Sequence, residues 1–144
     1  MGTVALDTCV LIYAMERHPE LGPQARAVLE VLDDPAGRLR GVVSTLALLE
    51  VLAQPLRLGR RDLAAAYRER LASPAGMLTL VPVSTTIAER AAELRASVPG
   101  LKTPDAIHAA TALVHRADAL ITNDAVFRSV PGLPVVMLPD WRAP

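Results

Sequence analysis

Short apolar runs alternate along the chain with longer segments in which apolar residues recur every three or four positions. In residues 24–32 the apolar side chains Ala25, Val28 and Leu29 follow the spacing of a helix with one buried face. The short runs have the length of strands. We expect strands at residues 3–6, 39–43, 77–83, 119–122 and 134–138, helices at residues 8–15, 24–32, 45–53, 61–71, 84–97 and 103–115, a loop at 73–76 and a helical turn at 124–128.

Capping residues and prolines mark two of the expected helix ends. Ser44 or Thr45 can cap the third helix, which should stop before Pro55 because proline disfavours the helical conformation in the residue that precedes it. Thr103 is expected to cap the sixth helix, with Pro104 at its first position. These boundaries complete an alternating order of strands and helices.

The alternation predicts an α/β fold with three layers and a mostly parallel sheet. A chain of 144 residues suits one domain with one sizeable core. Aromatic residues make up only 3% of the sequence, so Leu, Val, Ile and Ala must build that core. Such a composition fits helices that cover a buried parallel sheet.

Charge and cysteine content narrow the possible functions. The 15 basic and 15 acidic side chains cancel, which argues against a protein that coats nucleic acid through a general positive field. Cys9 is the only cysteine, so neither an internal disulfide nor a cysteine-rich zinc site is expected. Since we find neither a signal peptide nor a membrane span in the sequence, we expect a cytoplasmic protein.

Four acidic residues occupy positions where acids are unusual. Asp7 and Asp124 follow predicted strands, and in open α/β sheets ligands bind beyond the carboxyl ends of strands. Glu50 lies in a helix that is apolar nearly all round, so a solvated surface position does not explain it. Asp105 lies in the first turn of the sixth predicted helix and can reach the same edge of the sheet.

If these four carboxylates converge, they repel one another strongly, and a cation is the simplest remedy. Carboxylate ligands without cysteine favour a hard ion such as Mg²⁺ or Mn²⁺ over zinc. Such a site can activate water and stabilise the transition state of phosphodiester hydrolysis.

Each acid also has a structural interpretation. Asp7 and Asp124 could be turn residues, and Glu50 could pair with an arginine in the core. Asp105 could simply stabilise the start of its helix through the helix dipole. For His108, one turn after Asp105, a helix histidine whose hydrogen bonds are satisfied is the favoured interpretation over assistance in catalysis.

The sequence around these acids resembles the four acidic motifs of PIN domains, and in particular the VapC-like ribonuclease toxins of toxin–antitoxin pairs. The resemblance covers nearly the whole chain in the right order. The third motif is the most distinctive. The matching segments are Leu6-Asp7-Thr8, Leu49-Glu50-Val51, Thr103-Pro104-Asp105-Ala106-Ile107-His108-Ala109-Ala110 and Thr122-Asn123-Asp124-Ala125-Val126-Phe127.

This resemblance implies one PIN-like nuclease domain over residues 1–144, with a five-stranded sheet in the order 3-2-1-4-5. It implies metal-dependent cleavage of RNA with Mg²⁺ or Mn²⁺, a homodimer, and a small antitoxin protein as partner. The catalytic and metal-binding residues carry over as Asp7, Glu50, Asp105 and Asp124. Thr8 and Thr122 match hydroxyl residues of the motifs and are supporting candidates, for which a capping or strand role is equally plausible.

Other functions are less consistent with the sequence. A haloacid-dehalogenase-like phosphatase needs a second acid two residues after Asp7, where Cys9 stands. A nuclease outside a toxin–antitoxin system, a nuclease that cuts DNA, and a non-catalytic interaction module remain open alternatives. A locally basic stretch could bind RNA phosphates, although a solvated helix face is the favoured interpretation; its residues are Arg57, Arg60, Arg61, Arg68 and Arg70.

Overall fold

A computed structural model describes residues 2–72 and 76–144, so most of the loop expected at residues 73–76 lies outside the described residues. The strands are β1 (Gly2–Leu6), β2 (Leu39–Ser44), β3 (Leu78–Val81), β4 (Ala119–Thr122) and β5 (Val135–Met137). The helices are α1 (Thr8–Met15), α2 (Gly22–Asp33), α3 (Thr45–Arg57), α4 (Arg61–Ala72), α5 (Thr85–Ser97) and α6 (Thr103–Val114), with 3-10 turns at Ala125–Ser129 and Leu138–Asp140.

The strands form one parallel sheet in the order β3-β2-β1-β4-β5, which confirms the expected α/β fold. Ala5 in the central strand β1 lies opposite Val42 of β2 on one side and Leu120 of β4 on the other. The chain moves outward from β1 to β3 and then returns to place β4 on the far side of β1. The direction of winding therefore reverses between β1 and β4, where the carboxyl ends of parallel strands form a ligand-binding edge.

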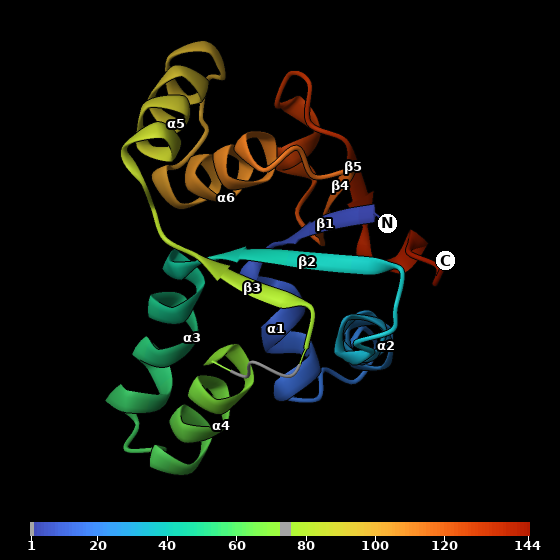
Figure 1. Cartoon of the computed structure of the whole chain (residues 1–144). Coiled ribbons are helices and arrows are strands. Elements are labelled where there is room, and N and C mark those ends of the chain that lie inside the picture. The colour runs from blue at the N-terminus through green and yellow to red at the C-terminus, as the bar shows by residue number, and fades with distance from the viewer. Residues whose placement is uncertain (1, 73–75) are drawn as a thin grey trace.

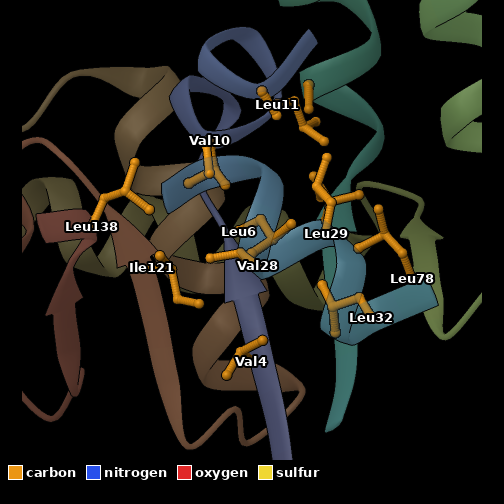
Figure 2. Packing of buried hydrophobic residues seen from close by; sticks show 14 of the residues in the cluster. Val4, Leu6, Val10, Leu11, Val28, Leu29, Leu32, Leu78, Ile121 and Leu138 are labelled. Carbon is orange, nitrogen blue, oxygen red and sulfur yellow. The ribbon is translucent and has the colours of Figure 1, made fainter. Parts of the chain in front are cut away.

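Helices cover both faces of the sheet. Figure 1 shows α1, α2, α3 and α4 on one face and α5 and α6 on the other. Successive residues of β1 point to opposite faces: Val4 and Leu6 join the cluster under the first four helices, and Ala5 joins the cluster under α5 and α6. In Figure 2, Val10 and Val28 of α1 and α2 pack close to Leu6.

The structure differs from the sequence-based expectation at the end of α3. This helix does not stop before Pro55 but continues through it to Arg57. Proline lacks an N–H, so one helical hydrogen bond is lost. Pro55, however, lies on the same buried face as Ala47 and Val51, and burial of its ring offsets that loss.

The cap of α6 also differs from the expectation. Lys102, rather than Thr103, is the N-cap residue, in an extended conformation and without a side-chain capping bond. The helical hydrogen bonds begin at the Lys102 carbonyl, which accepts from the amide of Ala106 at 2.9 Å. Thr103 is thus the first helical residue, and Pro104 remains in the first turn, where its missing N–H costs nothing.

None of the helices in residues 2–72 and 76–144 is long and apolar enough to cross a membrane.

Candidate active site

Asp7 lies at the junction of β1 and α1 and is almost completely buried, with 9% of its surface exposed. It is the N-cap of α1, and its Oδ1 accepts a hydrogen bond from the backbone N–H of Thr8 at 2.8 Å. Its Oδ2 accepts from the hydroxyl of Thr122 at 2.7 Å and from the thiol of Cys9 at 3.5 Å. Three donors thus hold this carboxylate at the carboxyl end of the central strand.

Thr122 connects the first and last acidic residues of the site. It is the final residue of β4 and is fully buried. Its hydroxyl donates to Asp7 and accepts from the backbone N–H of Asp124 at 3.0 Å. Asp124 in turn caps the following 3-10 turn by accepting from the amide of Val126 at 3.0 Å. One threonine hydroxyl therefore ties the segment that carries Asp124 to Asp7.

Glu50 reaches the same region from α3 and is held through one oxygen. Its Oε1 accepts from the hydroxyl of Thr8 at 2.8 Å and lies 2.6 Å from the Nε2 of His108. The hydrogen bond from His108 lowers the pKa of the Glu50 carboxyl; burial opposes this effect, and the Thr8 hydroxyl adds to it. Glu50 is therefore a carboxylate at neutral pH, bonded to residues next to Asp7 and on α6.

Asp105 stands in the first turn of α6, where it is partly buried. Burial raises the pKa of its carboxyl, and the negative charges of Asp124, Asp7 and Glu50 raise it further, while His108 acts in the opposite direction. Asp105 therefore lies within electrostatic range of the other three acids. We call Asp7, Glu50, Asp105 and Asp124 the acidic cluster.

Hydrogen bonds connect five of the six residues singled out from the sequence, namely Asp7, Thr8, Glu50, Thr122 and Asp124. Asp105 accepts no hydrogen bond from the described residues and is linked to the others only through the effect of their charges on its pKa. Thr8 and Thr122 join the acidic cluster through the hydrogen bonds just described. The cluster lies beyond the carboxyl ends of β1 and β4, the place where the winding of the sheet reverses. Its members come from four separate segments of the chain, so the tertiary fold alone brings them together.

The donor set of the acidic cluster fits a hard divalent cation. Carboxylate oxygens are the ligands that Mg²⁺ and Mn²⁺ prefer. The nearby Cys9 does not compete as a ligand, because burial and then the charge of Asp7 raise the pKa of its thiol to about 12. Within residues 2–72 and 76–144, no three His, Cys, Asp or Glu side chains already stand in an arrangement that could hold a metal ion. Asp7 and Glu50 instead direct oxygens to donors of the protein.

His108 is the site residue whose place the sequence did not indicate. The sequence favours a satisfied helix histidine over a catalytic role, and in the structure the ring is hydrogen-bonded, to Glu50 on α3. The one available signal was its spacing, since residues three apart in a helix share a face and His108 follows Asp105 by three.

The basic stretch is largely exposed and partly neutralised. Arg60 pairs with Asp62 at 3.2 Å, and Arg70 pairs with Asp33 at 2.8 Å. Within the described part of the chain, Arg57, Arg61 and Arg68 form no ion pair; all three are exposed. This arrangement is consistent with the solvated helix face that the sequence favours.

Comparison with known proteins gives one family and several similar structures. The sequence model of the PIN domain matches residues 4–133. No curated protein matches the sequence. A solved toxin–antitoxin complex from Klebsiella pneumoniae contains a chain that is 29% identical, with a TM-score of 0.70; the match covers 94% of this chain and 97% of that one.

Two more distant structures share the fold. A chain of VapBC2 from Rickettsia felis, solved with a DNA fragment from its promoter, is 20% identical, with a TM-score of 0.71, and the match covers 94% of this chain and 98% of that one. VapC20 from Mycobacterium tuberculosis, a sarcin–ricin loop cleaving toxin, is 19% identical, with a TM-score of 0.67 and coverage of 88% and 93%.

Proposed function

The chain belongs to the PIN domain family, a family of nucleases, and on that premise we propose that it is a metal-dependent endoribonuclease. The observation that carries the proposal is the placement of four carboxylates from separate segments near one edge of the sheet: hydrogen bonds link Asp7, Glu50 and Asp124 through Thr8 and Thr122. Burial, and then the charges of these three acids, raise the pKa of Asp105. A site so rich in negative charge suits a divalent cation and, through it, a phosphodiester substrate.

Asp7, Glu50, Asp105 and Asp124 are the residues that would hold Mg²⁺ or Mn²⁺. A bound cation would supply a more acidic water and would offset the negative charge that develops on the scissile phosphate. The protein contributes the placement of the ligands: Thr122 and the start of α1 fix Asp7, and Thr8 fixes one oxygen of Glu50. Thr8 and Thr122 therefore support the site without being ligands.

We further propose that the protein is the toxin of a toxin–antitoxin pair. The Klebsiella pneumoniae chain, from a toxin–antitoxin complex, aligns over nearly the full length of both chains. The last part of α3 and the residue after it expose Leu56 and Leu58, which are 50% and 64% accessible. An apolar helix of a small antitoxin could pack there, and one of its basic side chains could enter the acidic cluster. As the family resemblance implies, we expect the active form to be a homodimer.

Cleavage of RNA in vitro tests the nuclease proposal. The purified protein should cut total RNA in Mg²⁺ or Mn²⁺, and excess EDTA should stop it. Asp105→Asn should abolish cleavage and leave the fold intact, since the Asp105 side chain accepts no hydrogen bond from the described residues. Glu89→Gln removes one exposed acid from α5 and is the matched control, with unchanged cleavage expected. Full activity in EDTA, or in Asp105→Asn, would contradict the proposal.

Expression in cells tests the toxin assignment separately. The wild-type protein should arrest growth when expressed alone, and a small protein encoded beside it should restore growth. Asp7→Asn should relieve the arrest while still binding that partner. A harmless wild-type protein that copurifies with no small partner would remove the toxin assignment and leave the nuclease assignment standing.

A further inference from the structure

The ring of His108 connects α6 to Glu50 on α3. His108 is buried, with 3% of its surface exposed, and follows Asp105 by one helical turn. Its Nε2 lies 2.6 Å from Glu50 Oε1 and 3.1 Å from the hydroxyl oxygen of Thr8. The imidazole thus lies between two helices at the acidic cluster.

The contacts determine which ring nitrogen carries the hydrogen. A carboxylate only accepts hydrogen bonds, so the close approach to Glu50 requires an N–H at Nε2 of His108. The other ring nitrogen, Nδ1, is buried and has no hydrogen-bond partner among the described residues. His108 therefore acts on Glu50 as a hydrogen-bond donor through Nε2.

Two donors converge on the same oxygen of Glu50. Thr8, the residue after Asp7, donates its hydroxyl to Oε1 at 2.8 Å, and His108 donates to Oε1 from the opposite helix. Within the described part of the chain no hydrogen bond goes to Oε2. Fixing Oε1 from two sides fixes the orientation of the whole carboxylate and leaves Oε2 as the oxygen available for another ligand.

We propose that His108 is a positioning residue that holds Glu50 Oε1 so that Oε2 is directed to a divalent cation in the acidic cluster. This inference rests on the proposed function. Residues that hydrogen-bond to metal ligands orient them, and loss of such a partner typically weakens metal binding by 10- to 100-fold.

Thr111 shows what a purely structural polar residue on the same helix looks like. It is also buried, with 2% of its surface exposed, but its hydroxyl donates to the carbonyl of Ile107 within α6. His108 makes no such bond within its helix and instead bonds to Glu50 on another element. Thr111 therefore provides the matched control for the loss of a buried polar group from α6.

The experiment compares Mn²⁺ binding without RNA in His108→Leu, His108→Gln, Thr111→Val and the wild type, by calorimetry and by the electron paramagnetic resonance of free Mn²⁺. Leucine removes the donor, and Mn²⁺ affinity should fall by about 10- to 100-fold. Glutamine places an amide N–H near the position of Nε2, so the Mn²⁺ affinity of His108→Gln should lie within about threefold of that of the wild type. Thr111→Val should bind as the wild type does. Circular dichroism in EDTA verifies that each variant is folded.

The result that overturns the inference is equal Mn²⁺ affinity in His108→Leu and the wild type, or a glutamine variant as weak as the leucine variant. Both outcomes presuppose that the wild type binds Mn²⁺ and so leave the proposed function intact; no binding by the wild type would overturn both. If His108→Leu fails to fold, nitrogen-15 NMR of the wild-type imidazole tests the inference instead, by showing which ring nitrogen carries the hydrogen. A hydrogen at Nε2 supports the inference, and a neutral ring with its hydrogen at Nδ1 refutes it.

Discussion

Replacing Thr122 by valine removes a hydroxyl group while keeping a β-branched side chain of nearly the same volume at the end of β4. The lost hydroxyl donates to Asp7 at 2.7 Å and accepts from the amide of Asp124 at 3.0 Å, at a position with no solvent exposure. A hydrogen bond to a charged group contributes about 1.5–3 kcal/mol, and a neutral one about 0.5–1.5 kcal/mol. Asp124 is exposed, so water partly replaces its lost partner.

These contributions predict that Thr122→Val lowers the free energy of unfolding by about 2–4 kcal/mol. Thr122→Ser is the matched control, because it keeps the hydroxyl and loses one buried methyl group, at a cost of about 1 kcal/mol. With an unfolding entropy of about 2.1 cal/mol/K per residue over 144 residues, Tm should fall by about 7–13 °C for valine and by about 3 °C for serine.

Urea unfolding in EDTA at a fixed protein concentration measures both variants. The single tryptophan, Trp141, is buried and reports unfolding by fluorescence, and far-UV circular dichroism provides the second probe that a two-state analysis requires. Valine also suits a strand better than serine. Packing and strand propensity therefore predict that the valine variant is more stable than the serine variant, the opposite of the order predicted from hydrogen bonding. A valine variant as stable as the wild type, or more stable than the serine variant, would refute the argument from hydrogen bonding.

Two further predictions come from perturbed side chains. The pKa of Asp105 is raised, so its contribution to stability is fully present below the ordinary aspartate pKa of about 3.9 and is lost as the pH rises through the higher folded-state pKa. Asp105→Asn should therefore be more stable than the metal-free wild type at pH 7, by about 0.5 kcal/mol after allowance for solvent screening, and this advantage should vanish near pH 3 in thermal unfolding. For Cys9, whose pKa is raised to about 12 by burial and by Asp7, alkylation by iodoacetamide at pH 8 should be at least about 100-fold slower in the folded protein than in urea, because only the thiolate reacts. Equal rates, measured by mass spectrometry, would contradict the burial of this thiol.

The sheet was predictable because its signals are local. Each strand is a short apolar run. Val4 and Leu6 face one helical layer and Ala5 faces the other, so both faces of β1 are buried and its residues are all apolar. The strand order came from the family resemblance and agrees with the structure. The errors at Pro55 and Lys102 lie at helix ends, where burial and backbone hydrogen bonds outweigh the capping preferences of single residues.

The acidic cluster was predictable only in part. Asp7 and Asp124 follow strands, so their placement at one edge required nothing beyond the order of the sheet. His108 was not predictable, because its partners lie 58 and 100 residues away in the sequence, and the spacing within α6 shows only which face it shares with Asp105. A contact between α3 and α6 is a property of the packed fold, and no local pattern encodes it.

The four carboxylates differ in what compensates their charge. Asp7 accepts hydrogen bonds from Thr8 and Thr122, Glu50 accepts from Thr8 and a histidine, and Asp124 accepts from a backbone amide. Among the described residues no donor serves Asp105, and its pKa is raised by burial and by the other three acids. Hydrogen bonds within the protein thus stabilise three of the charges, and the fourth is left to interact with something else. On the proposed function that partner is the cation, whose positive charge would offset the burial and the repulsion that raise the pKa of Asp105.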